Sequence, residues 1–248
     1  MNTLFKREFP QLKILGLLSL AALTMMTSTA VQGADLVVKN GEQIAFMGDS
    51  ITQAGARPNG YVRLVISGLK AAGVKTTAIP AGISGHKSNQ MLARLEKDVL
   101  SKKPDWMTLS CGVNDVWHGA RGVNLEDYKV NITKIVERCE AAKVKVVILT
   151  STMIGEDEPN KNNQKLATYN EFLRPLAKEK NLPLADLNAD MQATIEGSKD
   201  KKKGRLFTSD GVHMNPDGNR MMAAGVLKAF GLSDTQLEKA QQAWSTKE

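Results

Sequence analysis

The sequence contains few of the residues on which the more specialised classes of protein depend. Its 248 residues include only two cysteines, eight prolines and three histidines, and aromatic residues make up 5% of the chain. Two cysteines are too few for a disulfide framework, and nothing is repeated, proline-rich or low in complexity. Hydrophobic residues at 42% and charged residues at 24% are close to globular averages. The composition therefore excludes collagen, coiled coil, disorder and a polytopic membrane protein.

A strong excess of charge is also absent. The formal net charge is +7, and it falls further if the N-terminal residues, which include Lys6, Arg7 and Lys13, are removed. This excess is too weak to indicate a nucleic-acid partner.

The first 33 residues have the three-part layout of a secretory signal. Basic residues precede an apolar run, and small residues follow it. The run of about 13 residues is shorter than the roughly 20 that a membrane-spanning helix needs. We expect cleavage after Ala30 or Gly33, which leaves residues 34–248 as one domain of an exported protein, periplasmic or secreted, with no stable membrane insertion. The alternative is an uncleaved N-terminal anchor.

Hydrophobic periodicity predicts strands and helices in strict alternation. The expected strands lie at residues 44–47, 76–79, 106–110, 144–150 and 184–187. The expected helices lie at residues 61–72, 90–100, 125–142, around 166–176, 217–230 and 233–244. The turn at Asn40-Gly41 predicts a hairpin that pairs residues 36–38 with the first strand. The alternation implies a three-layer α/β/α fold with a central, mostly parallel, five-stranded sheet.

Polar clusters follow the predicted strands. In open α/β sheets, ligands bind beyond the carboxyl ends of the strands, so these clusters are the first candidates for a site. They are Gly48-Asp49-Ser50-Ile51-Thr52, Pro80-Ala81-Gly82-Ile83-Ser84-Gly85, Gly112-Val113-Asn114-Asp115 and, before the last long helix, Asp210-Gly211-Val212-His213. We expect all four to converge on one edge of the sheet.

The clusters together supply the parts that acyl transfer requires. A serine hydroxyl becomes nucleophilic when a histidine takes its proton, and a carboxylate fixes the tautomer of that histidine. Ser50, His213 and Asp210 could fill these roles, because Asp210 and His213 are close enough in sequence to meet locally. The backbone N–H groups of Ser50 and Gly82 and the Asn114 amide could stabilise the oxyanion.

Each cluster taken alone has a simpler interpretation. Asp49 or Ser50 could cap a helix, Asn114-Asp115 suits a cap or a turn, and residues 210–213 could form a surface turn. Independent caps and turns have no reason to supply one complete mechanism, so we favour the catalytic interpretation.

With these four blocks in this order, the sequence resembles the SGNH hydrolases, also called GDSL esterases and lipases. The resemblance covers residues 34–248 and implies the family's flavodoxin-like fold. One departure is Ala81, which stands before Gly82 where the family often has Asn or Arg. The roles that the resemblance implies are Ser50 as nucleophile, His213 as base, Asp210 as the residue that orients it, and Ser50, Gly82 and Asn114 as the oxyanion hole.

Motifs for other chemistries are missing. The sequence has no Gly-x-Ser-x-Gly, no phosphate-binding glycine-rich loop with lysine and no His-Glu-x-x-His. Three scattered histidines cannot easily supply a metal cluster. We therefore expect neither a metal nor a cofactor, and full activity in the presence of a chelator.

The resulting hypothesis is an exported serine esterase that forms an acyl-Ser50 intermediate. Few aromatic residues and no long apolar lid segment argue against a deep tunnel for lipid chains, and compact exported family members often resemble carbohydrate acetylesterases. The expected partner is thus an acylated poly- or oligosaccharide, or another small ester. The alternatives are a lysophospholipase or thioesterase for longer acyl chains, and a carbohydrate-binding protein without activity. The sequence leaves the oligomeric state open.

The remaining histidines, His86 and His118, lie near the expected site, and neither has a carboxylate at the local spacing that Asp210 gives His213. His118 follows Trp117, and together they could contact substrate. The Trp117 ring could offer a stacking face for a sugar, or it could simply pack at the edge of the sheet.

Overall fold

The computed structural model describes residues 36–156, 159–198 and 204–245. The expected signal and its cleavage site lie outside these residues and stay predictions. Within the described residues, no helix combines the length and the apolar character needed to cross a membrane.

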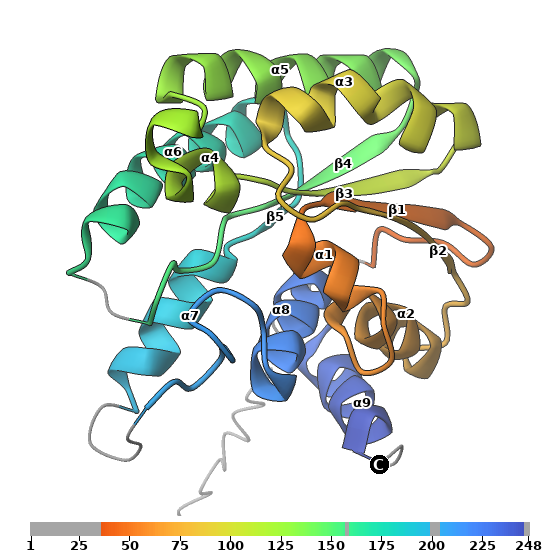
Figure 1. The fold of residues 1–248 in the computed structure, drawn as a ribbon. Helices are drawn as coiled ribbons and strands as arrows, with labels where there is room; N and C mark the ends of the chain where they lie inside the picture. Colours follow the sequence, from red (N-terminus) through yellow and green to blue (C-terminus); the bar gives the residue numbers. More distant parts are fainter. Residues whose placement is uncertain (1–35, 157–158, 199–203, 246–248) are drawn as a thin grey trace, which may run out of the picture. The chain divides into compact units, whose positions relative to one another are not determined.

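Five parallel strands form the central sheet, in the order β2-β1-β3-β4-β5 (Figure 1). They are β1 (Gln43–Gly48), β2 (Thr77–Gly82), β3 (Trp106–Ser110), β4 (Lys145–Leu149) and β5 (Leu184–Ala185). The predicted five-stranded sheet is confirmed. Pro80 lies within β2, where it is tolerated because β2 is an edge strand. Gly48 and Gly82 are register partners, so β1 and β2 end side by side.

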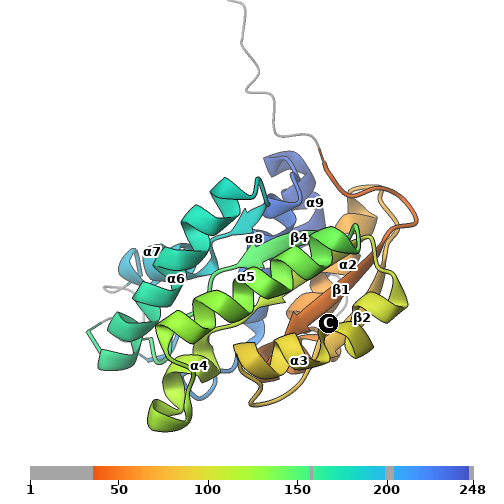
Figure 2. The ribbon, with the colours of Figure 1, turned by 90° about the horizontal axis from the view of Figure 1, so that it is seen from above.

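Helices cover both faces of the sheet, as Figures 1 and 2 show. One face carries α3 (Ser88–Asp98), α4 (Val113–Trp117), α5 (Leu125–Ala141) and α6 (Lys161–Glu179), with the short 3-10 helices η1 (Leu100–Lys102) and η2 (Gly119–Arg121) beside them. The other face carries α1 (Ser50–Gly55), α2 (Tyr61–Ala71), α7 (Leu187–Glu196), α8 (Pro216–Ala229) and α9 (Asp234–Ser245). This is the predicted three-layer α/β/α arrangement.

Helix α5 shows why the periodicity predicts the core so well. Its apolar residues recur every three or four positions, which places them on one face of a helix. Tyr128, Ile132, Ile135 and Val136 are all buried there, and Cys139 is a buried free thiol. Burial of each large apolar side chain contributes roughly 1.5–3 kcal/mol.

The predicted N-terminal hairpin is wrong. Asn40 and Gly41 do form a turn, with a positive φ of 89° at Gly41. However, Val37 N–H donates to the Phe230 carbonyl instead of to β1. Strand β1 has β2 on one edge and β3 on the other, so no edge is free for a hairpin arm.

Helix α7 is not among the helices that the periodicity predicts. It begins directly after β5, and the Asp186 side chain caps it by accepting a hydrogen bond from Ala189 N–H. Only Leu187, Asn188 and Met191 are buried on it, so its apolar pattern is too sparse to stand out from the polar sequence around it.

Candidate active site

Ser50 is the first residue of α1, immediately beyond the end of β1. The preceding residue, Asp49, caps this helix by accepting a hydrogen bond of 2.9 Å from Ile51 N–H. The capping interpretation therefore holds for Asp49, and it coexists with a Ser50 side chain that points to His213. The strand and the cap together fix where the hydroxyl lies.

Ser50, His213 and Asp210 form a continuous chain of hydrogen bonds. Ser50 Oγ lies 2.9 Å from His213 Nε2, and His213 Nδ1 lies 2.6 Å from Asp210 Oδ2. Burial opposes ionisation of Asp210, but hydrogen bonds from the His213 side chain and from the His213 and Val212 N–H groups lower its pKa below the usual range. An ionised carboxylate only accepts, so Nδ1 carries the proton and Nε2 is left to accept from the serine hydroxyl.

A small hairpin holds Asp210 and His213 at its tip. Thr208 and Met214 form an antiparallel bridge, and Ser209 N–H donates to the His213 carbonyl at 2.9 Å. At the tip, Gly211 has a φ of 102°, which suits glycine. Asp210 and His213, three residues apart in the sequence, therefore meet because the chain turns tightly between them.

Gly82 ends β2 directly against the backbone of α1. A Cβ atom at this position would lie 2.3 Å from the Gln53 nitrogen and 2.7 Å from the Thr52 carbonyl carbon. Only glycine permits this approach, which brings the Gly82 backbone next to the helix that Ser50 begins.

Asn114 lies on α4, just beyond β3, and its side chain is buried. Its Nδ2 donates to Asp49 Oδ2 at 3.0 Å, and its Oδ1 lies 3.1 Å from His118 Nε2. Because a carboxylate accepts, Asp49 fixes which way the amide faces, and His118 then donates to Oδ1. His118 therefore contacts Asn114, and its contact with substrate stays a hypothesis.

Asp49 is an unusual carboxyl because it is buried. Burial raises its pKa to about 6, although the Ile51 N–H, His213 and Asn114 act in the opposite direction. Since this value exceeds the ordinary 3.8, the contribution of Asp49 to stability falls as the pH rises from about 4 to about 6. Asp49 accepts hydrogen bonds from both the start of α1 and the Asn114 amide, and these bonds offset part of the cost of burying its carboxyl group.

Asp115, the one acidic residue of the third block, has a structural role. It is buried, and it accepts from the Ser88 N–H at 3.0 Å and from the Ser88 hydroxyl at 2.5 Å. Burial raises its pKa. It thereby anchors the start of α3 to the end of β3.

Arg94, which is not among the residues predicted from the sequence, ties two strand ends together. Its guanidinium donates to the carbonyls of Gly48 and Ala81, each at 2.8 Å, and to His86 Nδ1 at 3.1 Å. Burial and the Arg94 charge lower the pKa of His86. The only sequence signal was the Arg94–Asp98 spacing of four residues, which is common on helix surfaces.

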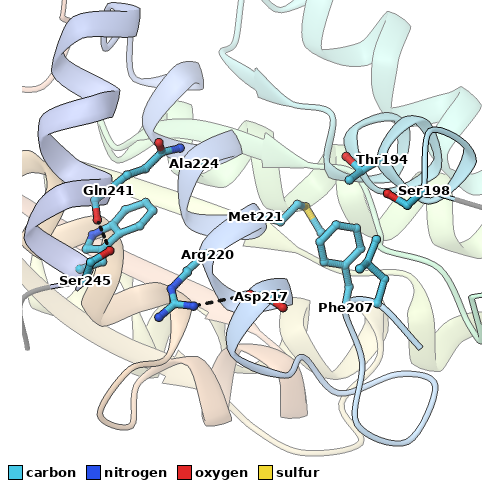
Figure 3. Close-up of a pocket in the computed structure, with 11 residues that line it drawn as sticks. Thr194, Ser198, Phe207, Asp217, Arg220, Met221, Ala224, Gln241 and Ser245 are labelled. Carbon is cyan, nitrogen blue, oxygen red and sulfur yellow. Dashed lines mark hydrogen bonds and ion pairs between the residues drawn. The ribbon is translucent and has the colours of Figure 1, made fainter. Parts of the chain in front are cut away.

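The described residues also enclose a cavity that lies away from Ser50, His213 and Asp210. This cavity of about 560 Å³ lies between α7, α8 and α9, with Arg220 and Asp217 paired at 3.5 Å in its wall (Figure 3). None of the predicted site residues lines it.

In the described ranges of the chain, no group of three or more His, Cys, Asp or Glu residues is arranged to hold a metal ion.

Residues 46–221 match the GDSL-like Lipase/Acylhydrolase family. The chain belongs to this family, and it is an ester-hydrolysing serine hydrolase.

Several relatives are similar over most of their length. The acetylxylan esterase of Geobacillus stearothermophilus is 27% identical over 216 residues, which are 78% of this chain and 96% of the relative. The crystal structure of the acetyl xylan esterase AlAXEase is 34% identical with a TM-score of 0.69, and the match covers 75% of this chain and 98% of that one. Thioesterase 1/protease 1/lysophospholipase L1 of Escherichia coli (strain K12) is 27% identical over 154 residues, 62% of this chain and 67% of the relative.

The contact between Gly82 and α1 leads to a prediction. Gly82→Ala should destabilise the protein by about 1–3 kcal/mol, because the added methyl must displace either β2 or α1. Gly197→Ala is the matched control: its φ is −65° and its Cβ would meet only ordinary contacts, so stability should hold or rise. Urea unfolding of both variants checks this, and equal stabilities would contradict it.

Proposed function

We propose that Ser50, His213 and Asp210 are the catalytic triad of an exported esterase that removes acetyl groups from acetylated poly- or oligosaccharides. The observation that carries the proposal is the chain of hydrogen bonds, 2.9 Å and 2.6 Å long, from the serine hydroxyl to the carboxylate. Export rests on the sequence of residues 1–33, and the domain is proposed to span 34–248.

The triad geometry suits a two-step acyl transfer. His213 Nε2 takes the proton of the Ser50 hydroxyl as Oγ attacks the ester carbonyl carbon, and a tetrahedral intermediate forms. As it collapses, His213 returns the proton to the departing sugar oxygen, which leaves an acetyl-Ser50 ester. A water molecule, deprotonated by His213, then attacks this ester; the bond between the acetyl carbon and Ser50 Oγ breaks, His213 returns the proton to Oγ, and acetate is released.

The proposed oxyanion hole consists of the Ser50 and Gly82 N–H groups and the Asn114 amide. Asn114 Nδ2 has two hydrogens, and it donates to Asp49 Oδ2 at 3.0 Å and to the His86 carbonyl at 3.4 Å. In the proposed mechanism the longer bond, to His86, is exchanged for one to the negative oxygen of the tetrahedral intermediate. Loss of one such donor typically lowers the rate by about 100- to 1000-fold.

Two observations favour an acetylated carbohydrate as substrate. Relatives whose names state an acetylxylan activity match nearly their whole length to this chain. In addition, the Trp117 side chain is 45% exposed, on α4 three residues beyond Asn114 and thus on the same helix face. A flat exposed ring one turn from the proposed oxyanion hole suits a sugar ring. The E. coli relative makes hydrolysis of longer acyl esters the second candidate.

The triad proposal is tested by removal of the serine hydroxyl. Ser50→Ala should lower kcat on p-nitrophenyl acetate by at least about 10⁴-fold, with an unchanged Tm because no core volume is lost. Ser84→Ala, at an exposed serine after β2, is the control and should keep full turnover. Turnover by Ser50→Ala near that of the unmodified protein would place the nucleophile elsewhere.

Acyl-chain preference separates the two candidate substrates. With p-nitrophenyl acetate, butyrate and octanoate, we expect kcat/KM to be highest for the acetate, and acetylated xylan to release acetate. A maximum at the octanoate would keep the mechanism and replace the substrate class. Saccharide binding without turnover of any ester would favour a binding protein.

The role of Trp117 gives a prediction of its own. Trp117→Ala should raise KM for acetylated xylo-oligosaccharides by about 2- to 10-fold, because a ring-stacking contact is lost. KM for p-nitrophenyl acetate, which has no sugar to stack, should not change. Val130→Ala, at another exposed apolar residue, controls for surface changes. Equal effects of Trp117→Ala on both substrates would exclude the stacking role.

A further inference from the structure

A second carboxylate, that of Glu156, binds the hairpin that carries Asp210 and His213. Glu156 is half-buried in the segment after β4. Its Oε2 accepts from Leu206 N–H at 2.5 Å. Its Oε1 accepts from the N–H groups of Phe207 and Thr208 at 2.8 and 2.6 Å, and from the Thr208 hydroxyl at 2.6 Å. One side chain thus satisfies four donors from three consecutive residues.

Three successive N–H groups that point to one oxygen pair form a concave anion-binding nest. In this backbone conformation the N–H groups face the same space, and they are satisfied only when an anion lies there. Phe207 and Thr208 are buried, so water has little access to take the place of the carboxylate. Glu156 therefore stabilises the conformation of residues 206–208 through their N–H groups, while Asn215 binds the Leu206 and Phe207 carbonyls at 3.0 and 2.9 Å.

This conformation is transmitted directly to the triad. Thr208 is bridged to Met214, the residue after His213. At the tip of the hairpin, Gly155 N–H donates to the Gly211 carbonyl at 2.6 Å. The segment that contains Gly155 and Glu156 thus contacts both an arm and the tip of the hairpin.

Packing around the triad cannot replace these contacts. The Asp210 and His213 side chains are 53% and 38% exposed, so few neighbouring atoms hold them. Their position relative to Ser50 therefore follows from the hairpin backbone. A displacement of about 1 Å at a reacting group can lower the rate by about 100-fold.

We propose that Glu156 is a positioning residue for the esterase reaction. Its carboxylate fixes residues 206–208, and through them it keeps His213 Nε2 within hydrogen-bonding distance of Ser50 Oγ. Glu156 touches none of the reacting atoms, so its loss should lower kcat and leave KM nearly unchanged. This inference rests on the proposed triad.

Glu156→Gln tests the proposal, because it keeps the shape and turns an amide toward N–H donors. We expect kcat on p-nitrophenyl acetate to fall by about 10- to 100-fold, with KM within about twofold. Glu42→Gln is the matched control. Glu42 also accepts from a backbone N–H, that of Lys39 at 2.7 Å, and from Trp106 Nε1 at 2.7 Å, but it lies near the opposite ends of the strands. The kcat of the Glu42→Gln variant should change by no more than about twofold, even if its Tm falls.

Chemical rescue separates positioning from general stability. Glu156→Ala empties the nest, and added formate can supply a carboxylate to it, so kcat should rise with formate concentration to a plateau. Glu42→Ala should show no such rise. If the Glu156 variants do not fold, Thr208→Val removes one of the four hydrogen bonds and should lower kcat by about threefold at constant KM.

The outcomes separate this inference from the triad on which it rests. If Ser50→Ala is inactive while Glu156→Gln and Thr208→Val keep the kcat of the unmodified protein, Glu156 has no positioning role and the proposed triad stands. If Ser50→Ala remains active, the triad fails and the role of Glu156 fails with it.

Discussion

The hydrogen bond between Ser50 Oγ and His213 Nε2 is the contact on which the rest of the candidate site depends. It joins residues 163 positions apart in the sequence. Ser50 is placed by the end of β1 and the cap of α1, whereas His213 is placed by a hairpin after α7. The bond forms only if the sheet, the helix start and the hairpin all have their native positions. Most of the polar interactions near the site act on one of these three parts.

Buried polar contacts hold the parts together at a cost. Asp49, with a pKa raised to about 6, links the cap of α1 to Asn114, and Asn114 in turn contacts His118. Arg94 joins the ends of β1 and β2 through two backbone carbonyls. Buried charges without partners would destabilise the fold, so these groups are tolerated only as a satisfied network. We interpret the network as the support that keeps Ser50 and the proposed oxyanion donors in position relative to each other.

The layers, the five strands and the meeting of Ser50, His213 and Asp210 were predictable from the sequence, because these depend on local patterns. The roles of Gly82 and Asn114 stay predictions. Apolar periodicity marks buried faces such as that of α5, and parallel strands bring their carboxyl ends to one edge. Contacts between residues that are distant in the sequence were not predictable in this way. The hairpin with residues 36–38 failed because β2 and β3 occupy both edges of β1. Arg94 and Glu156 were missed because they bind backbone groups distant in sequence, and no local motif marks such contacts.

The most direct test of the triad is to locate the residue that reacts covalently. The purified protein would be treated with a fluorophosphonate, which modifies an activated serine, and the adduct would be mapped by peptide mass spectrometry. We expect a single adduct on Ser50 that forms much more slowly in His213→Asn, because the base is lost. An adduct on another residue, or an active esterase with no adduct on Ser50, would contradict it.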